Sequence, residues 1–440
     1  MTASHAPTPG GSATSPRRDD PVIVWSWALY DWANSAFTTL VGTFIYSTYF
    51  TQAMAPDELT GTTWWSRAVA VSGILTAVLS PIFGAAADRA AARKAFLLGT
   101  TAVSIAATTV LTFVPPGLTN GALLALAIYV VADVTFEMSY VFYNAFLPTI
   151  ASPERIGRVS GYGWGLGYVG GLACMGIALI GFVQPAVPWF GLSTAQGFNI
   201  RATNLLVAVW FALFAIPLFV FVPEHRVGAV RVDVRGALRE LGETFRAVRR
   251  YREIVKFLGA RLVFNDGLVT VFAFGGIYAA GTFGMSLSEV IAFGFVLNIA
   301  SGLGAVACGF LDDRIGGKKT IMITLAALTV ATAIAVWAPG RVWLWTAGIL
   351  IGLFVGPNQS ASRSLMARFV PERQQAEFFG FFSFTGKVTS FMGPLLLGTV
   401  TAAFQSQRAG VATVILFFIV GAVLLTTVDE RRGIEAARTG

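Results

Sequence analysis

The stretch Trp25–Thr51, WSWALYDWANSAFTTLVGTFIYSTYFT, decides the class of fold. It is apolar and longer than the roughly 20 residues that a helix needs to cross a bilayer. Asp31, Asn34, Ser35 and Thr38 nevertheless recur at helical spacing, so they share one side of that helix. A carboxylate within a membrane span is costly unless it faces water, a substrate or an opposite charge. The stretch therefore predicts a membrane helix with a polar face.

The composition favours a membrane protein of many spans. Hydrophobic residues make up 55% of the 440 residues and charged residues 12%, with a mean hydropathy of +0.68, whereas soluble domains contain about 25% charged residues. The net charge of +8 lies in loops and does not indicate nucleic-acid binding. Cys174 and Cys308 lie in apolar runs, and His5 and His225 lie outside them. We therefore expect no metal, no cofactor and no catalytic residue.

Breakers rich in Pro and Gly separate twelve apolar segments, which predict an all-α membrane protein. Lys and Arg gather in alternate loops, which places both termini in the cytoplasm by the positive-inside rule. Only Arg67, Arg201, Arg341 and Arg408 then face the other side. Because Arg far outnumbers Lys, we expect a bacterial inner membrane. The segments are 22–50, 66–87, 95–114, 121–150, 160–183, 203–222, 257–281, 288–311, 320–338, 341–368, 377–404 and 410–428.

The chain also repeats itself, which predicts two pseudo-symmetric halves of six helices. The second and eighth segments are each followed by the pattern G-x-x-x-D-R and then by two basic residues, and the two copies lie 225 residues apart. Two six-helix halves joined by a long basic loop are the expected product of a duplication. The two copies comprise Gly84, Asp88 and Arg89 in the first half and Gly309, Asp313 and Arg314 in the second.

The basic loop between the halves has a pattern of its own. Val234, Leu238, Leu241, Phe245 and Val248 recur at helical spacing among arginines, which predicts an amphipathic helix on the inner leaflet or across the cytoplasmic face. A tether is favoured over a regulatory site. The expected units are a disordered tail at 1–20, the first half at 21–222, the linker at 223–256, the second half at 257–428 and a tail at 429–440.

The duplicated G-x-x-x-D-R loop resembles the signature of the major facilitator superfamily. This resemblance implies a transporter fold, usually monomeric, in which the Asp and Arg of each copy form a cytoplasmic charge network that gates transport. The first copy departs from the usual pattern at Ala90, Ala91 and Ala92. We therefore expect a weaker network in that half.

Three longer stretches carry a narrower resemblance. They are YDWANSAF (30–37), FYNAFLP…GRVSGYGWGLGYVGG (142–171) and SRS…EFFGFFSFTGKVTSFMGP (362–394). Together they resemble the Atg22-like branch, which comprises the bacterial UMF1 transporters and the fungal vacuole effluxers. For the fungal members the resemblance implies export of amino acids such as leucine and tyrosine.

Two carboxylates on the fourth segment are candidates for proton coupling. Asp133 and Glu137 lie one turn apart on a stripe that continues through Tyr140 and Asn144. Carboxylates this close repel each other, so in a low-dielectric site one tends to take up a proton near neutral pH. We also assign proton coupling to Asp31. The alternative is a structural pair bound to a basic group.

Other intramembrane charges are candidates for substrate binding. Lys387 with Asp31 would offer a cation and an anion to the two ends of an amino acid, or would form a salt bridge that holds the halves together. Arg261 is a second candidate for the cation, and its alternative is to extend to the cytoplasmic interface. Asp266 matches Asn34 when the two halves are aligned, which adds both residues to the predicted site.

These patterns predict a secondary active transporter of small solutes, with amino acids as the first candidate and protons as the coupling ion. It would act in a lipid bilayer, as a monomer, by alternating access. An exporter of drugs, lipids or other metabolites on the same fold remains an alternative. A membrane-embedded enzyme is a remote one, because no histidine lies in the apolar segments. The sequence contains no G-x-x-x-x-G-K-[ST] loop, so it does not favour an ATP-driven pump.

Overall fold

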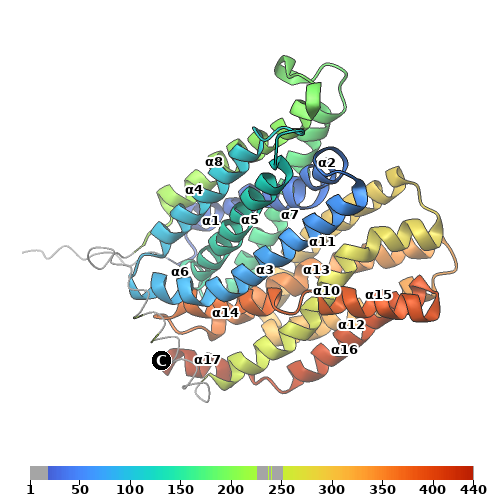
Figure 1. Ribbon diagram of the computed structural model, residues 1–440. Coiled ribbons are helices and arrows are strands. Elements are labelled where there is room, and N and C mark those ends of the chain that lie inside the picture. Colours follow the sequence, from blue (N-terminus) through green and yellow to red (C-terminus); the bar gives the residue numbers. More distant parts are fainter. Residues whose placement is uncertain (1–17, 225–235, 237–238, 240–250, 440) are drawn as a thin grey trace, which may run out of the picture.

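The computed structural model of the chain describes residues 18–224, 236, 239 and 251–439. Every regular element among these residues is a helix. Ten described helical stretches are long and apolar enough to cross a membrane. The helical run 21–54 and the helix Arg341–Phe369 complete a set of twelve. The predicted all-α membrane fold is therefore confirmed (Figure 1).

The first half contains six spans, and the first of them is irregular beyond its midpoint. Thr39 and Ser47 donate their hydroxyls to the backbone carbonyls of Ser35 and Thr43, which competes with regular helical bonding. The helix widens to π geometry here, as helices often do at functional sites. The spans are α1 (Pro21–Ala36) continued by η1 (Phe37–Phe44), α2 (Tyr46–Tyr49) and η2 (Phe50–Met54); α3 (Glu58–Arg89); α4 (Arg93–Leu111); α5 (Gly121–Ala145) with α6 (Leu147–Ile150); α7 (Ile156–Ala178) with η3 (Leu179–Val183); and α8 (Phe198–Phe221), which follows the short turns η4 (Trp189–Gly191) and η5 (Ala195–Gly197).

The second half also contains six spans, with differences in detail. The eleventh segment, predicted as one run, is divided into two helices, and the break directly follows Lys387. The elements are α10 (Arg252–Phe283), α11 (Leu287–Ile315), α12 (Gly317–Trp337), α13 (Arg341–Phe369), α14 (Gln375–Lys387), α15 (Met392–Phe404), α16 (Gln407–Thr426) and α17 (Glu430–Thr439).

Segments at both ends of the described chain contact the bundle. Asp20 caps α1 by accepting a hydrogen bond from Val22 N. Glu430 of α17 accepts hydrogen bonds from the backbone N–H groups of Gly317 and Lys318 and so caps α12. The predicted linker helix at 234–248 lies outside the described residues, apart from residues 236 and 239.

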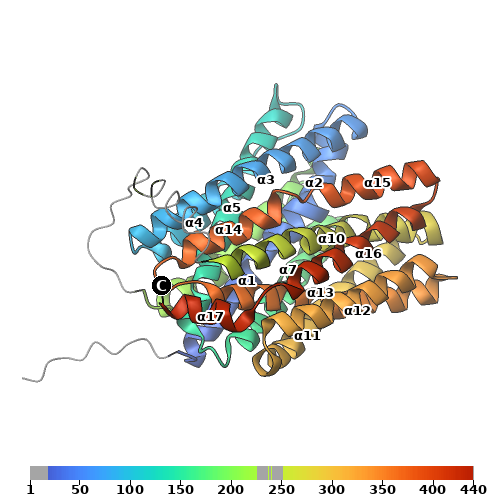
Figure 2. The same cartoon turned by 90° about the horizontal axis from the view of Figure 1, so that it is seen from below.

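The two halves pack together at the end of the bundle where Arg18 and α17 lie, which we call the terminal end (Figures 1 and 2). There α3 packs against α14, and α7 packs against α11 and α13. Glycines allow these helices to approach closely. A Cβ added to Gly161 of α7 would lie 2.5 Å from the carbonyl oxygen of Ala305 in α11. The packing thus depends on small residues, as is common in membrane helix pairs.

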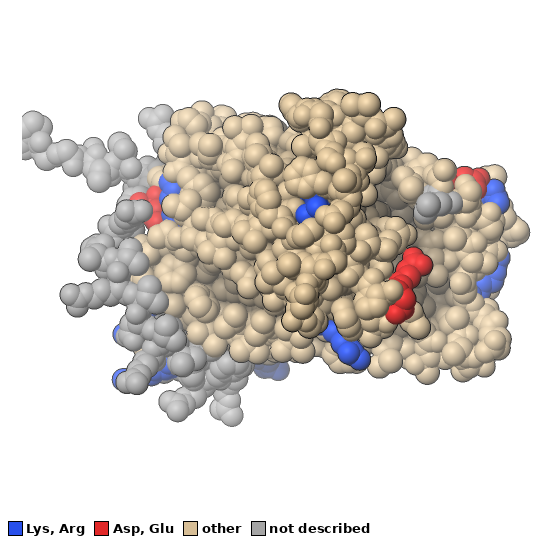
Figure 3. All heavy atoms as spheres, turned by 45° about the horizontal axis from the view of Figure 1, so that its top comes forward, with Lys and Arg blue, Asp and Glu red and all other residues tan. Residues whose placement is uncertain are grey.

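The outer surface suits a lipid environment. Large apolar side chains such as Ile74, Leu213 and Leu303 are more than half exposed. In the face shown in Figure 3, charged side chains are sparse over the middle of the molecule and collect toward its two ends. This distribution agrees with an apolar belt around a membrane-spanning bundle.

Candidate transport site

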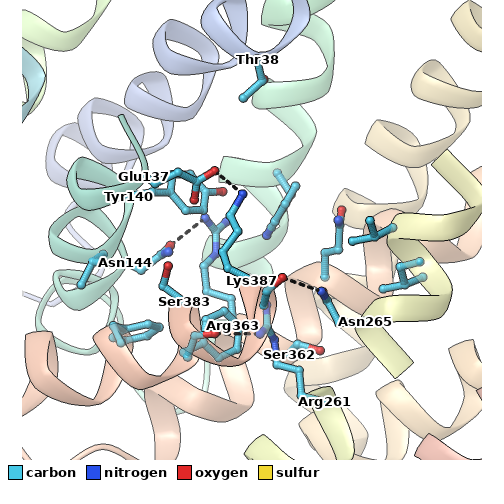
Figure 4. A pocket seen from close by; sticks show the side chains of 18 of the residues that line it. Thr38, Glu137, Tyr140, Asn144, Arg261, Asn265, Ser362, Arg363, Ser383 and Lys387 are labelled. Carbon is cyan, nitrogen blue, oxygen red and sulfur yellow. Dashed lines mark hydrogen bonds and ion pairs between the residues drawn. The ribbon is translucent and has the colours of Figure 1, made fainter. Parts of the chain in front are cut away.

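A cavity of about 320 Å³ lies between the two halves. Its volume is at the lower end of the range for small-molecule sites, which is about 300–1,000 Å³. Charged and amide side chains from both halves point into it (Figure 4). Its polar lining consists of Asn34, Ser35, Thr38, Glu137, Tyr140, Asn144, Trp164, Arg261, Asn265, Asn358, Gln359, Ser362, Arg363, Ser383 and Lys387.

An ion pair inside the cavity joins the two halves. Glu137 of α5 accepts a bond of 2.7 Å from the ammonium of Lys387 in α14 (Figure 4). Both side chains are partly accessible, with relative exposures of 17% for Glu137 and 34% for Lys387. The predicted ion pair between Lys387 and Asp31 does not form, because each of these residues has a different partner.

The neighbouring carboxylate has a different environment. Asp133 lies one turn from Glu137 on α5 but does not line the cavity. Its carboxylate accepts a hydrogen bond from the hydroxyl of Ser72 in α3. Of the three carboxylates that the sequence proposed for proton coupling, Asp31, Asp133 and Glu137, only Glu137 lines the cavity.

Arg261 also lines the cavity. Its guanidinium lies over the ring of Phe382, 3.6 Å from the ring centroid, a distance typical of cation–π stacking. Nη1 donates hydrogen bonds to the Phe382 carbonyl oxygen at 2.8 Å and to the Thr385 hydroxyl at 3.1 Å. The side chain is thus held by α14 and does not extend to the interface.

Asp266, by contrast, points away from the cavity that its neighbour Asn265 lines. The hydroxyl of Thr389 donates to the Asp266 carboxylate at 3.2 Å. Thr389 lies in the break between α14 and α15. Asp266 therefore contacts this break. The side-chain amide of the neighbouring Asn265 donates a hydrogen bond to the Gly386 carbonyl oxygen at 3.3 Å.

A second ion pair crosses between the halves at the wall of the cavity, where Arg363 lines it. Arg363 of α13 donates to the Asp31 carboxylate at 2.9 Å, and the two side chains are only 1% and 3% exposed. Tyr143 donates its hydroxyl to the same carboxylate oxygen, also at 2.9 Å. Arg363 further donates to the Ser160 hydroxyl and carbonyl oxygen and to the Asn144 side chain.

Aromatic rings surround this buried guanidinium. The Cζ atom of Arg363 lies 5.0 Å from the ring of Trp27, 5.7 Å from that of Tyr143 and 5.5 Å from that of Trp164. Sequence reasoning assigned Arg363 to the basic loops and missed this role. The signal was its position inside the predicted segment 341–368, five residues before the segment ends.

The two copies of G-x-x-x-D-R make equivalent contacts across the terminal end. Asp88 accepts hydrogen bonds from Glu377 N at the start of α14 and from Arg93 Nε, at 2.8 and 2.6 Å. Asp313 accepts them from Gly157 N at the start of α7 and from Arg158 Nε, at 2.8 and 2.5 Å. Each aspartate thus sits at the N-terminus of a helix from the other half, where a negative charge is favourable.

The glycine and arginine of each copy have distinct positions. A Cβ added to Gly84 would lie 2.9 Å from Glu377 Cα, and one added to Gly309 would lie 2.8 Å from Arg158 Cα. Arg89 and Arg314 are exposed, and other arginines pair with the two aspartates. We expected a weaker network in the first half, but both aspartates receive a backbone and a guanidinium bond.

Comparison with known proteins identifies the family. Residues 62–438 match the family described as "Vacuole effluxer Atg22 like". The chain belongs to this Atg22-like family. A Bacillus subtilis protein, the "Uncharacterized MFS-type transporter YxiO", is 29% identical over 421 residues, which cover 94% of this chain and 96% of that protein. "Autophagy-related protein 22-1" of Penicillium rubens is 24% identical over 302 residues, which cover 63% of this chain and 50% of the fungal protein.

Solved structures show the same fold as this Atg22-like chain. The major facilitator superfamily proton:xylose symporter XylE superposes with a TM-score of 0.73 at 12% identity, over 95% of this chain and 98% of that one. The transporter FucP in its outward conformation gives a TM-score of 0.72 at 13% identity, over 93% and 99% of the two chains. Together with the family match and the MFS-type relative, these structures confirm the resemblance drawn from the motifs: the chain is an integral multi-pass transporter of the major facilitator superfamily.

Proposed function

We propose that this Atg22-like chain transports amino acids, coupled to protons, by alternating access. The observation that carries the proposal is the ion pair in the cavity, in which Glu137 from one half binds Lys387 from the other. An amino acid carries an ammonium and a carboxylate. When an amino acid binds, its ammonium can pair with Glu137 and its carboxylate with Lys387, in place of the ion pair between these two residues.

Proton coupling follows from the same pair. The substrate ammonium binds the Glu137 carboxylate, so a proton on Glu137 competes with it. Protonation of Glu137 therefore releases the substrate, and loss of that proton allows the substrate to bind again. Binding of the proton and of the substrate are thereby linked, and by thermodynamic reciprocity each weakens the other.

Alternating access requires the terminal end to open and close around the cavity. That end is held by the buried Asp31–Arg363 pair and by the contacts of Asp88 and Asp313. In the proposed cycle these contacts break together when the two halves rock. The basic residues that gather in the loops at this end favour a cytoplasmic orientation, in the inner membrane of a bacterium. We further propose that the transporter acts as a monomer.

A second candidate function is the export of lipids or apolar drugs. An apolar groove of about 520 Å³ between α3, α10 and α14 favours it. Val78 and Val255 on its rim are half exposed toward the lipid side. The groove exposes almost no polar surface, whereas the central cavity is lined by four charged side chains, Glu137, Arg261, Arg363 and Lys387. We therefore rank amino acids first.

Flux into proteoliposomes under an imposed pH gradient tests the proposal. The wild-type protein should accumulate labelled amino acids against their gradient. Glu137→Gln should abolish accumulation driven by the pH gradient and keep exchange of internal for external substrate. Glu58→Gln, the same change at an exposed glutamate of α3 outside the cavity, is the matched control and should keep both activities. Accumulation that persists in Glu137→Gln would contradict the coupling role.

A further inference from the structure

The charges in the cavity indicate a particular class of amino acid. We propose that the cargo is an acidic amino acid, which carries two carboxylates and one ammonium. This inference rests on the proposed function, because it assumes that the cavity binds amino acids. It goes further by specifying the net charge of the substrate and the group that each charged residue binds.

Arg261 supplies the first argument. Within the described part of the chain no acidic side chain pairs with its guanidinium. Nη1 uses both of its hydrogens on Phe382 and Thr385, whereas Nε and Nη2 donate to none of the described residues. These two nitrogens form an edge that can bind a carboxylate with two parallel hydrogen bonds. Stacking on Phe382 fixes the orientation of that edge.

The balance of charge supplies the second argument. Arg363 adds no net charge to the cavity, because Asp31 neutralises it. The remaining charges of the described lining are the cations of Arg261 and Lys387 and the anion of Glu137. Asp133, a second carboxylate near Lys387, lies one turn from Glu137 outside this lining. A neutral amino acid bound between Glu137 and Lys387 would therefore leave the guanidinium of Arg261 without an acidic partner, which is costly. An acidic amino acid has the complementary set of two negative charges and one positive charge.

The two cations are also neighbours. A Cβ added to Gly386, the residue before Lys387, would lie 3.2 Å from Nη1 and 3.4 Å from Nη2 of Arg261. The guanidinium therefore lies against the backbone turn that carries Lys387. Two adjacent cations repel each other, and a dicarboxylate relieves the repulsion. In our assignment one substrate carboxylate binds Arg261, the other binds Lys387, and the ammonium binds Glu137.

Unpaired polar atoms supply the third argument. Four buried side-chain atoms of the cavity lining have no hydrogen-bond partner among the described residues. Buried polar atoms are almost always paired, so a cluster of unpaired ones in a cavity indicates a polar ligand. Three of the four are donors, which suit carboxylate oxygens. They are Asn34 Nδ2, Trp164 Nε1 and Ser362 Oγ, and the acceptor is Asn358 Oδ1.

Binding of three matched ligands to the purified full-length protein tests the inference. L-glutamine replaces one carboxylate of L-glutamate by an amide, and glutarate lacks the ammonium. By calorimetric titration we expect glutamate to bind about tenfold or more tightly than either, because each loses one charge-assisted interaction. Aspartate and asparagine provide a second pair with the same expected order.

Variants identify the residue responsible. Arg261→Lys keeps the charge but loses the two-nitrogen edge, so glutamate should bind about tenfold more weakly and the preference over glutamine should shrink. Arg252→Lys, the same change at an exposed arginine of α10 outside the lining, is the matched control and should keep the wild-type preference. The ligand series on the wild-type protein decides the inference even if Arg261→Lys does not fold.

Four results would overturn the inference or its assignment of Arg261. Glutamine that binds as tightly as glutamate would remove the need for a second carboxylate. A neutral amino acid such as leucine that binds more tightly than glutamate would refute the acidic cargo and leave the proposed amino-acid transport in place. If no amino acid binds, the inference and the proposed function fail together. An unchanged preference in a folded Arg261→Lys protein would also refute the assignment of Arg261.

Discussion

Replacement of Arg363 by methionine should open the terminal end of the bundle. In the wild-type protein Arg363 and Asp31 form an ion pair between the two halves, and both side chains are almost fully buried. Methionine keeps much of the side-chain volume but removes the guanidinium from the Asp31 carboxylate, which keeps the hydroxyl of Tyr143 as a donor. An open terminal end would expose Asp31 to water and relieve this cost.

The expected magnitude follows from the burial of the pair. Removal of one partner of a buried ion pair costs about 3–5 kcal/mol, because the other charge stays behind unpaired. In Arg363→Met the closed arrangement should be less stable by this amount, relative to an open arrangement in which water hydrates Asp31. The equilibrium between the two should then shift by a factor of about 100 to several thousand. The double variant Asp31→Asn/Arg363→Met removes both charges and should recover most of the loss.

Distances between spin labels on the two halves provide the assay. Glu154, before α7, and Lys319, in α12, are exposed and belong to opposite halves. Labels at these positions, in a background that lacks Cys174 and Cys308, should move apart in Arg363→Met. Arg314→Met, which removes an exposed arginine of α11, is the control and should keep the wild-type distances.

The reasoning would be refuted if Arg363→Met kept the wild-type distance distribution. It would also fail if a double-mutant cycle on thermal stability gave no coupling between Asp31 and Arg363. Residues in direct contact within one buried network usually show coupling of about 0.5–3 kcal/mol. A value near zero would mean that the pair does not hold the halves together.

Three further predictions concern the contacts between halves and the cavity. Asp88→Asn and Asp313→Asn should each weaken closure of the terminal end modestly, because the two aspartates make equivalent contacts. The double variant should weaken closure more, and the same label distances would measure both effects. Gly161→Leu should lower the midpoint of thermal unfolding and open the terminal end, because the new side chain would meet the backbone of α11. Gly176→Leu on the same helix is the control and should have little effect, because no atom lies within 4 Å of a Cβ added there. Asp133→Asn should keep coupled uptake in proteoliposomes, because its carboxylate does not line the cavity; loss of coupling would return Asp133 to the proton pathway.

The fold could be predicted because its causes are local. A bilayer requires long apolar helices, and charges in alternate loops set their direction. The run that begins at Trp25 and the repeated G-x-x-x-D-R pattern were therefore enough to give the spans and the two halves. The exact break after Lys387 was not predicted, although Gly386 and Pro394 lie on either side of it. A proline disturbs the helix at the residue four positions before it, which for Pro394 is Ser390 in the break.

The site could be predicted only in part. The sequence placed Glu137, Arg261 and Lys387 inside the membrane, and all three line the cavity. The partners of these charges depend on how helices from opposite halves are rotated against each other, and nothing local encodes that rotation. Asp31 and Arg363 lie 332 residues apart and meet only through this packing.

A screen of ligands against the thermal stability of the purified protein tests the central claim most directly. A ligand at 100 times its dissociation constant should stabilise the fold by about 2.7 kcal/mol, which such a scan detects. We predict stabilisation by amino acids, the acidic ones most strongly, and its loss in Lys387→Ala. Stabilisation by sugars, nucleosides or apolar drugs with none by amino acids would contradict the account of the cavity.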